Sequence, residues 1–427
     1  MNDIKEVRSA HLDDFYYKVK HQSGLTVYIY PKNKNNSTYA VFGTKYGSID
    51  NCFKIAGEKE PHKVPDGIAH YLEHKLFESE DGDAFARYAK TGASANAYTS
   101  FYNTCYLFSC TQNVYESLEI LLDFVQSPYF TKETVQKEQG IIGQEIKMYD
   151  DDPQWCVLFD LLEAMYHNHP VKNDIAGTVA SIARITPELL YECYNTFYNL
   201  NNMVLCVAGN VDAEKVIAMC DKMLKPSKPI RIDRIFEEEP RHIVRARVEK
   251  KLAVASPMFN LGFKEDAGGP MAGVEKVART DILLEALAGD FTKLYRSLLD
   301  KGLINENTFG KEYFEGPGFA SVIFGGDSKD PDAAAEEIKK EIERVRREGI
   351  DAADFRMAQK SLYGHSVSAL NDVGNIANSL AALSLSGRDF FGYIDAIADA
   401  DIDGVNARLE TQLMPEYSSL SVVKPFG

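Results

Sequence analysis

Two histidines and a glutamate, close together in the sequence, carry the strongest chemical signal of the chain. They lie in the segment HYLEH, residues 70–74. Residues four apart lie on one face of a helix, so His70 and His74 can direct two imidazoles at one point. This H-x-x-E-H order is the inverse of the H-E-x-x-H zinc signature and contains the same residue types. The pattern therefore predicts a zinc site with Glu73 beside it.

The expected chemistry is hydrolysis. Zinc lowers the pKa of its water to about 7 and polarises a peptide carbonyl, while a carboxylate takes the proton of that water. Glu73 follows His70 by three residues, so it stays near the same helix face. The alternative is a pair of surface histidines beside a glutamate. The apolar residues Leu76 and Phe77 that follow argue against it, because they indicate a partly buried helix.

A third protein ligand is needed to complete a catalytic zinc site. A later helical stretch offers Glu138 and Glu145, seven residues apart and hence about two turns along one face. Glu138 lies in KETVQKEQ, which has the composition of a solvated surface, whereas Glu145 follows the apolar pair Ile141-Ile142. Either carboxylate can reach back to the histidines, so the residues alone leave the choice open.

The elements that must position these groups recur in both halves of the chain. Each half runs strand, helix, two strands, helix, helix, and the helices carry apolar residues at i, i+3 and i+4. We therefore expect an α+β fold of two homologous α/β-sandwich-like repeats, each a mainly antiparallel sheet packed with helices. An N-terminal zinc-binding repeat is expected over 1–230 and a charged, proline-containing linker over 231–248. A degenerate C-terminal repeat without a metal site is expected over 249–427.

Composition and charge argue against several classes of protein. The 427 residues include 47 Lys and Arg against 63 Asp and Glu, a formal charge of −16. An acidic surface repels phosphate backbones and anionic membranes, so we expect no nucleic-acid partner and no membrane partner. No apolar run reaches the roughly 18–20 residues of a membrane span, and the N-terminus lacks a secretory pattern. Seven cysteines without a CxxC pair favour a reducing, cytoplasmic location.

Further segments extend the signal beyond the HYLEH helix. In chain order they are GIAHYLEHKLFE, GASANAYTS, EQGIIGQEIKMYDDDP, HPVKNDIAGTVASIARIT and NMVLCVAGNVD. This succession resembles the insulinase/pitrilysin family of inverzincin metallopeptidases. The likeness is greatest to its short, two-repeat bacterial members of processing-protease type, including Firmicute members linked with elongation factor P modification. It covers the first half through motifs and the second half only through the order of elements.

The resemblance implies a role for each candidate residue of the site. His70, His74 and Glu145 would be the ligands of one Zn²⁺ per chain, and Glu73 would be the general base. Glu138 would steady a ligand histidine through a hydrogen bond.

The resemblance also implies how a substrate would be held. Asn96 and Ala97, in GASANAYTS, resemble the strand that pairs with the substrate backbone in this family. A peptide held as an added β-strand in a closed chamber favours short or unstructured substrates. The implied activity is that of a zinc-dependent endopeptidase.

The second half departs from the family pattern. Its equivalent helix, GVEKVARTDILLEALAGDF, carries no histidine. The family's substrate-binding arginine and tyrosine, seven apart, are missing at Leu299–Asn305, and Arg296 and Tyr313 are out of register. A second chain, in a homodimer or in a heterodimer with a zinc-less paralogue, would supply the missing donors. The alternatives are a non-hydrolytic assembly or binding subunit, a partner-dependent processing subunit, and maturation of one dedicated substrate.

Overall fold

The structure, a computed structural model, describes residues 2–80, 82–265 and 268–426. Packing divides the chain into two compact units that do not follow chain order. Unit 1 comprises Met1–Ile146, Asp174–Ile235 and Val367–Gly392, and unit 2 comprises Lys147–Asn173, Phe236–Ser366 and Tyr393–Gly427. The division of the two repeats at residues 231–248 stays a prediction, because these units record packing rather than sequence repeats.

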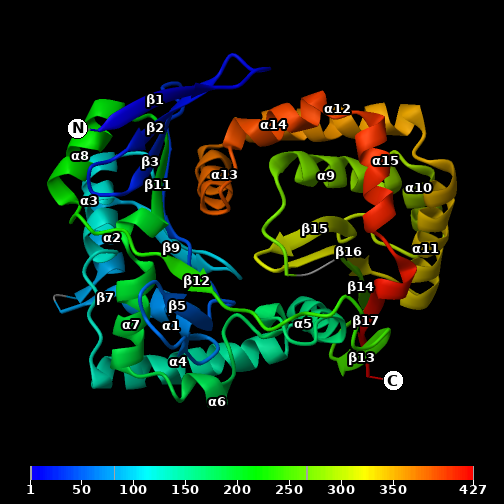
Figure 1. Cartoon of the computed structure of the whole chain (residues 1–427), viewed down its shortest axis with the longest axis horizontal. Coiled ribbons are helices and arrows are strands. Elements are labelled where there is room, and N and C mark those ends of the chain that lie inside the picture. Colours follow the sequence, from blue (N-terminus) through cyan, green and yellow to red (C-terminus); the bar gives the residue numbers. More distant parts are fainter. Residues whose placement is uncertain (1, 81, 266–267, 427) are drawn as a thin grey trace. The chain divides into compact units, whose positions relative to one another are not determined.

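Unit 1 is built on a seven-stranded sheet (Figure 1). Its strands, in spatial order, are β1 (Asp3–Arg8), β2 (Phe15–Lys20), β3 (Thr26–Pro31), β11 (Met203–Gly209), β4 (Thr38–Thr44), β10 (Thr104–Cys110) and β9 (Ser94–Thr99). β3 and β11 run parallel, and the other neighbouring pairs are antiparallel. β11 is buried along its whole length and β3 along all but its last residue. Such strands are covered on both faces.

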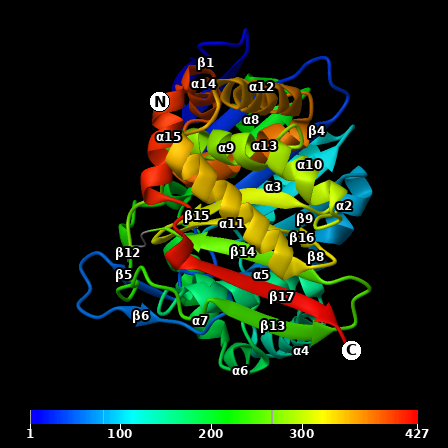
Figure 2. The same cartoon turned by 90° about the vertical axis from the view of Figure 1, so that its right-hand side faces the viewer.

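The five strands of unit 2 repeat the core of this sheet (Figure 2). In spatial order they are β13 (Arg247–Leu252), β17 (Ser418–Pro425), β14 (Met258–Lys264), β16 (Phe319–Asp327) and β15 (Gly310–Gly316). The first pair is parallel and the other three pairs are antiparallel, as in the series β3, β11, β4, β10, β9. This shared topology confirms the expected α+β fold of two homologous, mainly antiparallel halves.

One helix of each sequence half packs on the sheet of the other half. α5 (Pro153–Met165) lies on β14 and β17 within unit 2, and α13 (Val373–Leu385) lies on β11 and β4 within unit 1. A glycine makes room on each sheet. A Cβ on Gly43 of β4 would come within 2.9 Å of the Leu385 side chain, and one on Gly262 of β14 within 2.6 Å of the Met165 sulfur. The exchange explains why the packed units cross the chain order.

The remaining helices cover the other face of each sheet or join the layers. In unit 1 they are α1 (Ile68–Leu76), α2 (Ala84–Thr91), α3 (Val114–Phe124), α6 (Val179–Ile182), α7 (Pro187–Phe197) and α8 (Ala213–Met223). In unit 2 they are α9 (Val274–Ala288), α10 (Lys293–Asp300), α11 (Pro331–Glu348) and α15 (Ile402–Thr411). Three helices cross between the units: α4 (Lys132–Asp150), α12 (Ala352–Ala369) and α14 (Phe390–Asp399). None of the helices in the described ranges is long and apolar enough to span a bilayer.

Short strands and turns complete the chain. A three-stranded sheet has the order β12 (Ile232–Arg234), β5 (Cys52–Ile55), β6 (His62–Lys63), and a hairpin pairs β7 (Glu78–Ser79) with β8 (Gly82–Asp83). Three 3₁₀ turns span Pro170–Lys172, Leu200–Asn202 and Pro415–Tyr417.

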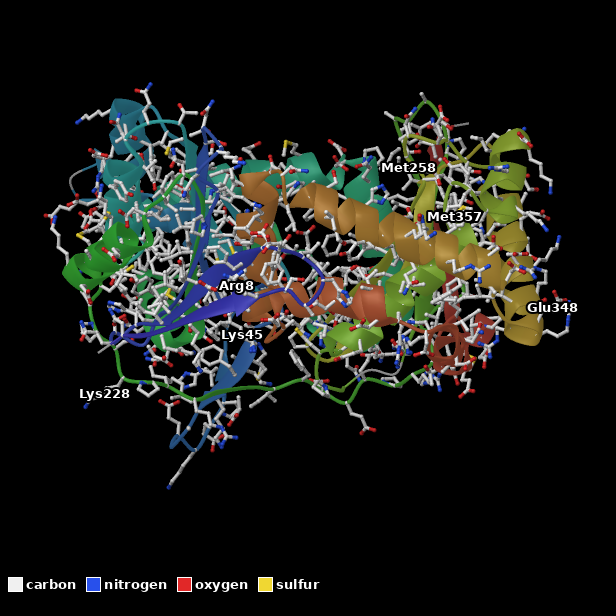
Figure 3. The ribbon with its side chains drawn as sticks, turned by 90° about the horizontal axis from the view of Figure 1, so that it is seen from above. Arg8, Lys45, Lys228, Met258, Glu348 and Met357 are labelled. Carbon is white, nitrogen blue, oxygen red and sulfur yellow. The ribbon has the colours of Figure 1, made fainter. Side chains whose placement is uncertain are left out.

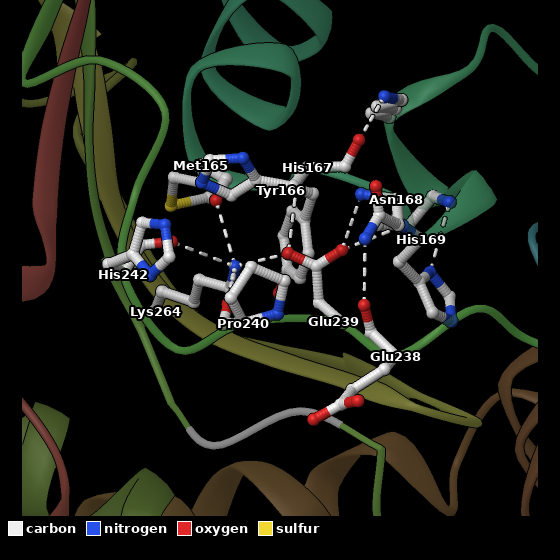
Figure 4. A network of polar contacts seen from close by, with 12 residues as sticks. Met165, Tyr166, His167, Asn168, His169, Glu238, Glu239, Pro240, His242 and Lys264 are labelled. Carbon is white, nitrogen blue, oxygen red and sulfur yellow. Dashed lines mark hydrogen bonds and ion pairs between the residues drawn. The ribbon is translucent and has the colours of Figure 1, made fainter.

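A buried ion pair fastens part of the expected linker within unit 2 (Figure 4). Lys264 is 1% exposed, and its ammonium group donates to the Glu239 carboxylate at 2.5 Å and to the Met165 and Pro240 carbonyls. The same carboxylate accepts the three successive backbone N–H groups of residues 167–169. Every polar group of the pair is therefore matched by protein, and this part of the segment is anchored rather than free.

Candidate active site

Helix α1 presents the HYLEH motif from a partly buried position. The helix begins after Gly67, whose φ of 89° lies in the left-handed region. A Cβ on Gly67 would lie 2.3 Å from the Ala176 carbonyl oxygen, so both the turn and the close approach require glycine. Gly177 meets the chain before α1 in the same way, because its Cβ would lie 2.5 Å from the Asp66 carbonyl oxygen. This close packing fixes where α1 starts and therefore which residues face inward.

Helix α4 brings the two acidic candidates to the motif. The Tyr71 hydroxyl of α1 donates to the Val135 carbonyl of α4, which ties the two helices one turn before Glu138. Glu138 accepts a hydrogen bond from Nδ1 of His74 at 3.0 Å. Glu145, two turns further along, lies with its carboxylate against the other nitrogen of His74. The seven-residue spacing thus places both carboxylates at the motif in different positions.

Three potential ligand groups converge at one point. Oε1 of Glu145 lies 3.7 Å from Nε2 of His70, and its Oε2 lies 3.3 Å from Nε2 of His74. One ligand atom from each of the three residues falls within 4.8 Å of the other two. In the part of the chain that the structure describes, no other group of three His, Cys, Asp or Glu side chains meets this condition. Two imidazoles and a carboxylate are a ligand set that suits zinc.

Glu73 lies beside this cluster without joining it. Its side chain is 8% exposed and accepts a hydrogen bond from the Thr99 hydroxyl at 2.6 Å. Burial raises the pKa of Glu73 to about 7, against the opposing effect of the Thr99 hydrogen bond. A carboxylate with a pKa near neutrality is suited to exchange a proton with water.

The two histidines differ in their surroundings. Burial, with a smaller contribution from the neighbouring His74, lowers the pKa of His70 to about 4. Burial also lowers the pKa of His74, but hydrogen bonds to Glu138 and Glu145 outweigh it and raise this pKa to about 10. The bond to Glu138 fixes a proton on Nδ1 of His74 and leaves Nε2 directed at Glu145. That arrangement is the one that orients an imidazole for a metal.

A pocket of about 500 Å³ opens beside the cluster and reaches the sheet edge. It is lined by residues of α1, the β7–β8 hairpin, β9 and α4, among them Glu73, His74, Asn96, Ala97 and Glu138. β9 is the last strand of the seven-stranded sheet, and no strand in the described ranges pairs with its outer edge. The Ala97 N–H donates to the Asn96 side chain at 2.9 Å.

The structure brings every residue of the predicted site together. His70, His74 and Glu145 converge, Glu73 and Glu138 flank them, and the strand of Asn96 borders the same pocket.

The Tyr313 side chain contacts two charged residues of unit 2. Its hydroxyl donates to Glu265 at 2.8 Å, and its ring lies beside the Arg408 guanidinium. Arg296 is exposed on α10.

Sequence reasoning missed two features of the site. Thr99 holds the Glu73 carboxylate, and its position in GASANAYTS was a usable signal, since strand residues 97 and 99 point to one side. Phe77 and Phe85 stack at 4.4 Å between ring centroids and form the apolar wall of the pocket. Phe85 lies on a different helix from the motif, so no local pattern indicated the pair.

Family models and similar proteins agree with this geometry. Residues 56–179 match the family model described as Insulinase (Peptidase family M16), and residues 184–362 match Peptidase M16 inactive domain. An uncharacterised zinc protease of Bacillus subtilis, YmfH, is 42% identical over 99% of both chains. A crystal structure of an M16-like peptidase from Alicyclobacillus acidocaldarius is 38% identical, with a TM-score of 0.93 over 98% of this chain and 100% of the other. A protease from Helicobacter pylori shares the fold at 20% identity, with a TM-score of 0.79 and full coverage of both chains.

The full-length similarity to YmfH and the two family models settle the relationship. The chain belongs to the insulinase (M16) peptidase family, as a short member made of two homologous halves.

Proposed function

We propose that the protein is a zinc-dependent endopeptidase that hydrolyses short or unstructured peptides. The observation that carries the proposal is the convergence of His70, His74 and Glu145, with the buried carboxylate of Glu73 beside them. The zinc protease names of its relatives support the same metal. When bound, zinc supplies Lewis acidity that polarises a peptide carbonyl and acidifies water.

The residues of the chain divide the remaining work. His70, His74 and Glu145 hold one metal ion, and Glu138 orients His74 through Nδ1. Glu73 accepts a proton from water and returns it to the leaving amine, and Thr99 holds its carboxylate in place. All three proposed ligands lie in the first half of the chain, and we assign no metal to the second half.

Substrate binds along β9 as an added strand. The free outer edge of β9 supplies backbone donors and acceptors next to the pocket that contains Glu73. An extended peptide can add to such an edge, whereas a folded protein has no free strand to offer. The Ala97 N–H must exchange its local bond to Asn96 for one to the peptide.

A second chain completes the catalytic chamber. Tyr313 is bound to Glu265, and Arg296 is out of register with the family's substrate-binding arginine, so we assign neither as a donor to the reacting carbonyl. A donor of that kind is worth roughly 10²–10³ in turnover. We propose a homodimer or a heterodimer with a zinc-less paralogue as its source. The free thiols of all seven cysteines fit a cytoplasmic location.

Cleavage of a quenched fluorescent peptide library by the purified, zinc-loaded protein tests the proposal. Glu73→Gln should lower kcat/KM by about 10²–10⁴ while one zinc per chain is retained. The matched control is Glu133→Gln, which removes an exposed carboxylate from α4 and should leave the rate unchanged. Equal cleavage by Glu73→Gln and the control would overturn the assignment of the base. No cleavage by any form would show that the chain alone is not a self-sufficient peptidase.

A further inference from the structure

We propose that unit 1 contains a second binding site, a basic pocket that takes a small phosphate-bearing anion. The basic pocket has a volume of about 380 Å³. Its cationic residues are Lys18, Lys20, Lys45 and Arg388, and Asp389 is its one acidic residue. The chain as a whole carries a formal charge of −16, so this local excess of positive charge runs against the composition.

Sheet register places the lysines on one face. Lys18 pairs with Tyr28 and Lys20 with Thr26 across β2 and β3, so the four side chains share a face. α13 packs on β11, β4 and β3, and its last residue, Leu385, lines the basic pocket. Residues 201–204 and Lys45, which follows β4, complete the wall (Figure 3 labels Lys45).

The lysines lack carboxylate partners. Within the described residues, Lys18, Lys20 and Lys45 form no ion pair. Lys20 is exposed, but Lys18 and Lys45 are half-buried, and most other buried or half-buried cations of the chain are paired. Lys20 donates to the Thr26 hydroxyl at 2.9 Å, and the Lys18 ammonium lies 5.5 Å from the Tyr28 ring centroid. These neutral contacts hold the ammonium groups in place without neutralising them.

Lys45 stands in the least favourable position for an uncompensated charge. Burial lowers its pKa, and the nearby Arg234 lowers it further, against the opposing effect of Asp50. Asp50 is itself engaged by the Arg234 guanidinium. A bound anion would remove the mutual repulsion of these cations.

Two features of the fold offset only part of the positive charge of the basic pocket. The C-terminal carbonyls of a helix attract cations, and α13 ends at the basic pocket. Its carbonyls at 382–384 already accept the N–H groups of residues 386–388. Asp389 accepts hydrogen bonds from the Tyr16 hydroxyl and the Gly392 N–H, at 2.9 and 2.8 Å. Both donors are neutral, so its carboxylate keeps one negative charge, against several cationic residues in the lining of the basic pocket.

The size and chemistry of the basic pocket indicate the ligand class. Lysine ammonium groups bind phosphate as point charges, and Asn201 and Asn202 add polar groups at the rim. The volume lies within the roughly 300–1,000 Å³ typical of small-ligand sites. It suits pyrophosphate or the phosphates of a nucleotide.

Calorimetric titration of the chelator-treated protein with pyrophosphate tests the proposal. Chelation empties the candidate zinc site, which would otherwise compete for the anion. At a constant ionic strength of about 0.15 M, pyrophosphate should bind with a Kd below about 1 mM. The double variant Lys18→Gln, Lys45→Met should weaken binding at least about tenfold, or 1.4 kcal/mol. The matched control is Lys90→Gln, which removes an exposed lysine from α2.

The titrations can either support or overturn an anion site in the basic pocket. Undetectable binding to the parent, or the same Kd for the double variant and the control, would overturn the proposal. If circular dichroism shows that the double variant does not fold, Lys20→Gln is measured in its place. Lys20 is exposed, and its substitution should also weaken pyrophosphate binding at least about tenfold. The same titration with ADP distinguishes the two sources of phosphate. Equal Kd values for ADP and pyrophosphate would identify a free phosphate anion as the ligand, whereas a lower Kd for ADP would identify a nucleotide. Both results support the basic pocket, and neither depends on peptidase activity.

Discussion

Each unit buries a cluster of polar groups, and the two clusters differ in how their hydrogen-bonding capacity is used. In unit 2, Lys264 and Glu239 are matched by each other and by backbone groups. In unit 1, the ligand atoms of His70, His74 and Glu145 face one another, and Nδ1 of the buried His70 has no hydrogen-bond partner among the described residues. Burial of polar groups is common to both clusters, whereas among the described residues three metal-ligand side chains converge only in unit 1.

This difference separates a structural role from a binding role. A buried ion pair that is matched throughout holds chain segments together and has nothing left to offer a ligand. Two imidazoles and a carboxylate whose ligand atoms lie within 4.8 Å of one another can be bridged by one metal ion. We therefore interpret the cluster of unit 2 as an anchor and propose the cluster of unit 1 as a metal site.

The largest effect should come from breaking the matched pair. Lys264→Met leaves the Glu239 carboxylate buried without its counter-ion, so the free energy of unfolding should fall by about 3–5 kcal/mol. Urea denaturation followed by circular dichroism measures it. Lys301→Met is the control, because its pair with Glu337 is exposed and should contribute about 1 kcal/mol or less. An equal loss of unfolding free energy in Lys264→Met and Lys301→Met would contradict the structural role of the buried pair.

The second effect is a pH dependence in unit 2. His169 is fully buried, donating to the Pro317 carbonyl and accepting from the Val171 N–H. Burial lowers its pKa to about 4, whereas an unfolded histidine titrates near about 6.5.

The unfolded chain therefore takes up the proton first, and stability is lost as pH falls from about 6.5 to about 4, by about 3 kcal/mol in all. His169→Gln should remove this slope from denaturation curves measured across that range. His365→Gln, at an exposed position, should leave the slope in place. A parent slope that survives in His169→Gln would assign it to other groups.

The third prediction sharpens the metal side of the comparison. Glu138→Gln weakens the hydrogen bond that orients His74, so zinc affinity should fall about 10–100-fold. Competition with a fluorescent zinc chelator measures the affinity. The exposed Glu133→Gln variant of the same helix should bind zinc as the parent does. Unchanged affinity in Glu138→Gln would remove the orienting role.

The smallest effect concerns two glycines near the site. A Cβ on Gly140, within α4, meets no atom within 4 Å, so Gly140→Ala should raise stability by about 0.5–1 kcal/mol. Gly67→Ala should lower stability, because its φ is positive and its Cβ would collide with the Ala176 carbonyl. Thermal unfolding of the two variants compares them. A loss of stability in Gly140→Ala would show that α4 needs its local freedom.

The sequence predicted the features that depend on short-range spacing. The convergence of His70 and His74 followed from helical geometry. The existence of two similar series of strands and helices followed from periodicity, and the structure contains two sheets with matching strand topology. The choice between Glu138 and Glu145 was different. Both lie on the same face of α4, and only the docking of α4 on α1 determines that Glu138 meets Nδ1 of His74 while Glu145 meets Nε2.

By itself, then, the sequence determined the two-repeat α+β fold and the residues that could hold a metal, because both are encoded in local periods of two to four residues. Only the tertiary structure decided the exchange of α5 and α13, the bond from Thr99 to Glu73, and the basic pocket around Lys18 and Lys45. Those features join segments far apart in the chain. Their geometry depends on how whole faces pack, which no local pattern records.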